Sequence, residues 1–104
     1  MTWILLFAAA AFEVVWALAL KSSDGFSNPL PTAIFGVGVV ASMVLLALAM
    51  RDLPVGTAYA VWTGTGAVGT AILGIIYFGD SATVQRLAAI ALVATGIVWL
   101  ALTE

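Results

Sequence analysis

Four long apolar stretches, separated by short polar breaks, account for most of this chain of 104 residues. A helix needs about 20 mainly apolar residues to cross a lipid bilayer. We therefore predict spanning helices over about 2–20, 32–50, 57–78 and 84–102, in a single four-helix transmembrane domain. Inside a bilayer the backbone polar groups must be satisfied within the protein, and four plain helices meet that condition. The sequence thus predicts an all-α membrane protein whose neighbouring helices run antiparallel.

The composition excludes several other classes. The chain is 64% hydrophobic and 8% charged, whereas a soluble domain carries about 25% charged residues. A soluble protein of this size would also lack the interior to hide so much apolar surface. The net charge of −2, without a basic run, argues against a nucleic-acid partner. Because the chain has no cysteine and no histidine, we expect no metal site, no cofactor and no enzymatic activity.

One charged residue stands apart from the others. Seven of the eight lie at breaks between apolar stretches or at the C-terminus, but Glu13 lies in the middle of the first stretch. This internal acid, and the lack of Lys or Arg before it, favour a spanning helix over a cleaved signal peptide. A carboxylate in a membrane is costly and usually marks an ion or substrate path. Without histidine, Glu13 is the natural proton-binding group; the alternative is a polar clamp between helices.

Aromatic and small residues surround this acid at helical spacing. Trp16 shares a face with Glu13, and Ala10 leaves space beside it. The third stretch carries a polar and aromatic stripe of Tyr59, Trp62, Thr63, Gly66 and Thr70. Aromatic faces attract cations, most strongly when desolvated, so we interpret this setting as a cation site. Tyr59 alternatively belongs to an interfacial aromatic belt.

Other polar and small residues extend the hypothesis. Ser42, in the second stretch, either orients the carboxylate or bonds its own backbone. Gly64 and Gly66 predict a kink or a close helix crossing in the third helix. Ala89 and Gly96, seven residues apart, predict a dimer contact on the fourth helix.

The loop charges predict no preferred orientation. Arg51 and the α-amino group share one side of the membrane, and Lys21 and Arg86 share the other. Because an excess of Lys and Arg sets orientation, this even balance permits insertion in both directions and an antiparallel dimer. The alternative is one orientation set by weak signals.

Taken together, the chain resembles the small multidrug resistance family over its whole length. The resemblance rests on the four spans, Glu13, Lys21 followed by Gly25-Phe26, and the run from Pro54 to Gly64 that reads PVGTAYAVWTG. Trp16, Ser42 and Trp62-Thr63-Gly64 resemble the guanidinium-exporter subtype.

This resemblance implies a dual-topology antiparallel homodimer in the bacterial inner membrane that exchanges protons for cations. It implies that Glu13 binds both proton and substrate, oriented through hydrogen bonds from Trp16, Ser42 and Trp62. Tyr59 would line the site and contribute to switching. By the same resemblance, the glycines would form a helix kink and the fourth helix a dimer contact. Ala10 departs from the family, because guanidinium exporters commonly have glycine there.

The leading hypothesis is therefore a proton-coupled exporter of guanidinium or small guanidinyl compounds. A second hypothesis keeps the fold but assigns quaternary-ammonium or polyaromatic cations as substrates. A third, of another class, is a small pore-forming or assembly subunit in which Glu13 is structural.

Overall fold

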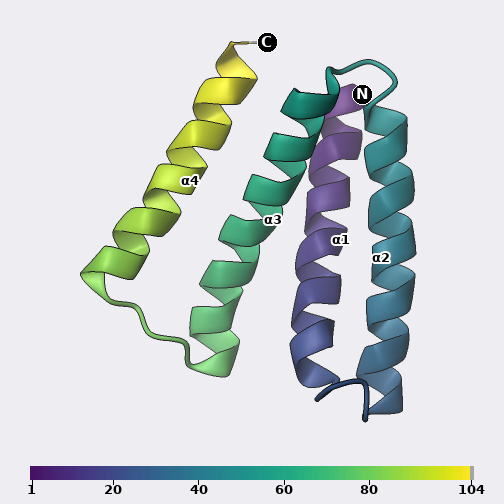
Figure 1. Cartoon of the computed structure of the whole chain (residues 1–104), viewed down its shortest axis with the longest axis vertical. Helices are drawn as coiled ribbons and strands as arrows, with labels where there is room; N and C mark the ends of the chain where they lie inside the picture. The colour runs from purple at the N-terminus through teal and green to yellow at the C-terminus, as the bar shows by residue number, and fades with distance from the viewer. Residues whose placement is uncertain (104) are drawn as a thin grey trace.

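The computed structural model describes residues 1–103 and has four helices: α1 (Thr2–Ser22), α2 (Pro29–Ala49), α3 (Val55–Phe78) and α4 (Val84–Leu102). Each helix is long and apolar enough to cross a membrane. Successive helices run in opposite directions, and the start of α1 and the end of α4 lie at the same end of the molecule (Figure 1). The predicted fold class, an all-α protein with four potential spans, is confirmed at this level.

Several helix ends differ from the expected bounds by one to three residues. Helix α1 continues to Ser22, and α2 ends at Ala49. Helix α2 begins at Pro29 because Asn28 before it is extended (φ −96°, ψ 117°) and proline fits the first helical position. Helix α3 begins at Val55, directly after a proline. The first two connections are therefore shorter than the sequence suggested, and the third has the predicted bounds.

Helix α1 lies between α2 and α3 and contacts both, whereas α4 packs on α3 and reaches neither α1 nor α2 (Figure 1). The buried hydrophobic cluster is built from α1, α2 and α3 alone: Leu6, Ala9, Ala10, Leu46, Ala49, Ala58, Val61 and Trp62. No residue of α4 is buried among the described residues. The molecule is thus a three-helix unit with a fourth helix along one edge.

Glycine allows the helices of this unit to approach closely. A Cβ atom added at Gly38 of α2 would lie 2.8 Å from the Cβ of Trp16, and one added at Gly69 of α3 would lie 2.7 Å from Val14. In a bilayer such contacts matter, because lipid is as apolar as the side chains and association depends on packing and hydrogen bonds. These contacts fix α1 between its neighbours and so place Glu13.

Candidate functional site

Glu13 lies in the middle of α1, on the side that faces α3. Its Oε1 atom is buried and has no hydrogen-bond partner within residues 1–103. Gly66 of α3 lies directly against the carboxyl group, so that an added Cβ there would overlap it. A carboxylate oxygen that has lost water without gaining a partner is unstable unless it binds a proton or a cation. The geometry therefore suits a group that takes up one or the other.

A chain of two hydrogen bonds joins three helices beside this acid. The indole Nε1 of Trp62 on α3 donates to Ser42 Oγ on α2 over 3.0 Å, and Ser42 Oγ donates to the Ala9 carbonyl on α1 over 2.7 Å. Both bonds are buried. Ala9 lies one helical turn before Glu13. Ser42 and Trp62 therefore hold the backbone of α1 next to the acid.

This arrangement differs from the one implied by the family resemblance. There, Trp16, Ser42 and Trp62 donate to the Glu13 carboxylate. Here, Ser42 and Trp62 donate to other acceptors, and the buried Nε1 of Trp16 has no partner within the described residues. Ser42 and Trp62 thus lie at Ala9, one turn before Glu13, and none of the three donors binds the carboxylate in this conformation.

The Trp16 ring is held by packing with other aromatic residues. Its ring meets that of Phe35 edge-on, with centroids 5.8 Å apart and planes at 82°. Phe26, from the turn after α1, meets Phe35 at 5.6 Å. Edge-to-face pairs of this kind are favourable arrangements. The Trp16 indole is thus fixed on the α2 side of α1, three residues from Glu13.

The remaining predicted lining residues differ in exposure. Ala10 is buried in the core cluster. Tyr59 has its ring 5.6 Å from Trp62, but 55% of the residue is exposed, and Thr63 is exposed too. The latter two side chains therefore face lipid or another molecule rather than the interior of this chain.

The predicted kink residues lie within one continuous helix, α3. A Cβ at Gly64 would lie 2.8 Å from the side chain of Ile97 on α4, and Gly66 meets Glu13. The need for close approach on both sides of α3 accounts for both glycines. A kink at these positions stays a prediction.

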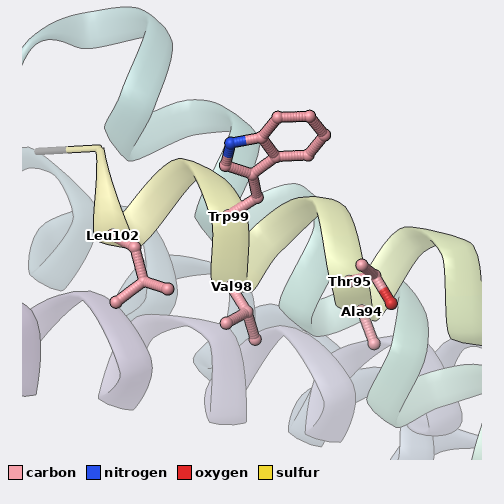
Figure 2. Close-up of a pocket in the computed structure, with 5 residues that line it drawn as sticks. All are labelled: Ala94, Thr95, Val98, Trp99 and Leu102. Atoms are coloured by element: carbon pink, nitrogen blue, oxygen red, sulfur yellow. The ribbon is translucent and has the colours of Figure 1, made fainter.

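The outer face of α4 is apolar and uncovered. A hollow of about 460 Å³ on this helix is lined by Ala94, Thr95, Val98, Trp99 and Leu102. Figure 2 shows these five side chains. Ala89 and Gly96, the predicted dimer contact, are also exposed, and nothing lies within 4 Å of a Cβ added at Gly96. The contact itself stays a prediction.

One buried polar group of α3 is not among the residues predicted from the sequence. Thr65 of α3 has a buried Oγ1 without a hydrogen-bond partner within residues 1–103. The polar and aromatic stripe predicted on α3 contains Trp62 and Gly66 but not Thr65. Thr65 follows Trp62 by three residues and precedes Gly69 by four. This helical spacing is the signal that places Thr65 on the same side of α3 as these two residues.

Comparisons with known proteins agree on one family. The sequence model of the Small Multidrug Resistance protein family matches residues 1–93. A guanidinium exporter of Escherichia coli K12 is 54% identical over 103 residues, which cover 99% of this chain and 98% of that protein. Guanidinium exporters of Yersinia pseudotuberculosis and Proteus vulgaris are 54% and 51% identical over 104 residues, the full length of each pair.

Proposed function

The chain belongs to the Small Multidrug Resistance protein family, and on this premise we propose that it exports guanidinium or small guanidinyl cations in exchange for protons. It is a multi-pass protein of the bacterial inner membrane. Similarity to proteins named guanidinium exporters over almost the whole chain supports the substrate. The observation that carries the mechanism is the buried, unpartnered Oε1 of Glu13.

In the proposed cycle, deprotonated Glu13 binds the cation from the cytoplasmic side. The protein then exposes the site to the other side, where a proton binds the same carboxylate and releases the cation. The protein then exposes the site with protonated Glu13 to the cytoplasmic side again, where Glu13 releases its proton. Because a protonated carboxyl group no longer holds a cation strongly, competition for one group is sufficient to couple the two flows.

We further propose that the working unit is an antiparallel homodimer with two Glu13 carboxylates in one site. Two features support it. Arg51 and the α-amino group on one side balance Lys21 and Arg86 on the other, which permits both orientations in the membrane. The uncovered face of α4 offers an apolar surface for a second copy.

A quaternary-ammonium substrate is the second candidate, favoured by the paired rings of Tyr59 and Trp62. Aromatic faces bind such cations without hydrogen bonds. Transport currents with guanidinium and with tetrapropylammonium separate the two substrates. The comparisons give no support to a pore or assembly subunit, since the relatives named above are exporters.

The test of the mechanism is Glu13→Gln in reconstituted liposomes. Guanidinium uptake driven by a pH gradient should fall to the level of protein-free liposomes, because glutamine keeps the shape but binds neither proton nor cation. Asp24→Asn is the matched control: it removes an acid from the exposed turn after α1 and should leave uptake unchanged. Proton-coupled uptake that survives Glu13→Gln would refute the mechanism.

A further inference from the structure

Three buried side-chain atoms in α1 to α3 have no hydrogen-bond partner within residues 1–103: Glu13 Oε1, Trp16 Nε1 and Thr65 Oγ1. Buried polar groups are nearly always paired, so each exception calls for a reason. Glu13 and Trp16 already belong to the proposed site. The unpartnered hydroxyl of Thr65 is not explained by that site.

The hydroxyl of Thr65 is buried but, unlike those of Thr32 and Thr95, bonds no carbonyl of its own helix. A threonine hydroxyl in a helix usually bonds the carbonyl four residues earlier. Thr32 does so with Asn28 over 2.7 Å, and Thr95 with Ala91 over 2.8 Å. Thr65 has the same option in the middle of α3 but does not use it. The Thr65 hydroxyl is therefore buried without a partner within the described residues.

The register of the helices places Thr65 near Glu13. Helices α1 and α3 run in the same direction (Figure 1). Gly69 of α3 meets Val14 of α1. One turn earlier on both helices, Thr65 comes opposite Ala10, which shares a face with Glu13. The next residue of α3 after Thr65 is the glycine that lies against the carboxyl group.

The three unpartnered atoms differ in whether they can accept a hydrogen bond from a ligand. An indole N–H only donates, so Trp16 cannot accept from a cation. The Ser42 hydroxyl already accepts from Trp62 and donates to Ala9. Glu13 Oε1 and Thr65 Oγ1 are therefore the two atoms of this unpartnered group that can accept a hydrogen bond from the N–H groups of a ligand. A guanidinium group carries several N–H donors in one plane, which suits two acceptors at once.

We propose that Thr65 is a ligand-binding residue of the Glu13 site that selects cations carrying N–H groups. This inference rests on the proposed function. The guanidinyl cation donates one N–H to the Thr65 hydroxyl and others to the Glu13 carboxylate, while the hydroxyl proton stays free to donate to the same carboxylate. A quaternary ammonium has no N–H group and gains nothing from the hydroxyl.

The test compares Thr65→Val, which replaces the hydroxyl by a methyl group of similar size, with Thr65→Ser, which retains it. Guanidinium and tetrapropylammonium binding is measured on purified protein by calorimetry. Thr65→Val should weaken guanidinium binding about tenfold and leave tetrapropylammonium binding unchanged, whereas Thr65→Ser should stay within about twofold of wild type. Thr32→Val is the control, because it removes a hydroxyl far from Glu13. If Thr65→Val folds poorly, Thr65→Ala serves the same comparison.

Two results would overturn the inference. One is unchanged guanidinium binding by Thr65→Val; the other is an equal loss in Thr65→Val and Thr65→Ser, which would indicate packing rather than a hydrogen bond. In either case wild-type binding of guanidinium leaves the proposed function standing. A wild-type protein that binds no guanidinium refutes both.

Discussion

Gly66 of α3 lies so close to Glu13 of α1 that a Cβ atom at residue 66 would overlap the carboxyl group. The acid on one helix thus depends on the absence of a side chain on another. A Cβ atom at residue 66 would therefore push the carboxyl group, the far end of a flexible side chain, out of its present position. This relationship makes glycine at residue 66 part of the site.

Gly66→Ala should therefore impair transport. The added methyl group must displace either the Glu13 side chain or the α1–α3 contact, and overpacking of this kind costs about 1–3 kcal/mol. We expect guanidinium uptake into liposomes to fall at least tenfold. Gly36→Ala is the control, because nothing lies within 4 Å of its added Cβ. Normal uptake by Gly66→Ala would show that the site tolerates a displaced carboxylate.

The Trp62–Ser42–Ala9 hydrogen bonds should act as one unit. Ser42→Ala removes both bonds and leaves the buried indole N–H of Trp62 without its acceptor, at a cost of about 1–3 kcal/mol in unfolding free energy. Trp62→Phe should remove one of the same bonds, so the double variant should lose less than the sum of the single losses. Unfolding in detergent mixtures, followed by circular dichroism, measures the unfolding free energies of the wild type, the two single variants and the double variant. Strictly additive losses would argue against the coupled pair.

Competition between proton and substrate predicts a direction for pH dependence. Lower pH adds a proton to Glu13 and removes the charge that holds the cation, so the Kd for guanidinium should rise as pH falls. At a pH where most Glu13 carboxylates are protonated, the Kd for guanidinium should rise about tenfold for each further unit of pH decrease and each proton displaced. Binding titrations across pH measure it. A Kd that does not change with pH would contradict a shared carboxylate.

The balanced loop charges predict that single charge removals will bias insertion. Arg51→Ala should leave the excess of positive charge on the side of Lys21 and Arg86. Lys21→Ala should leave it, with the α-amino group counted, on the side of Arg51. Each variant alone should insert mainly one way and lose guanidinium export, because an antiparallel dimer needs both orientations. Expression of both variants together should restore export.

The chain has no cysteine, so a single Thr103→Cys substitution reports orientation by labelling from outside the cell. Mixed orientation in either single variant, with export retained, would refute the role of the charges.

The sequence was sufficient to predict four potential spans and to identify Glu13 as the acid within one of them. Both follow from the cost of polar groups in lipid, which acts on each residue without regard to its neighbours. Helix spacing put Trp62 on one stripe with Tyr59 and Thr63, but in the structure Trp62 is buried while the other two are exposed. Helix spacing did not predict which acceptor Ser42 uses, because a serine hydroxyl has several partners within reach.

What the sequence alone determined about this protein is therefore where its helices lie and which acid is out of place among them. The tertiary structure decided the partners: Gly66 against Glu13, Ser42 on the Ala9 carbonyl, and Thr65 with a free hydroxyl on the inner side of α3. Periodicity gives the face of a helix on which a residue lies. Contacts between faces depend on the register of one helix against the next, which is set by packing between small residues far apart in the chain.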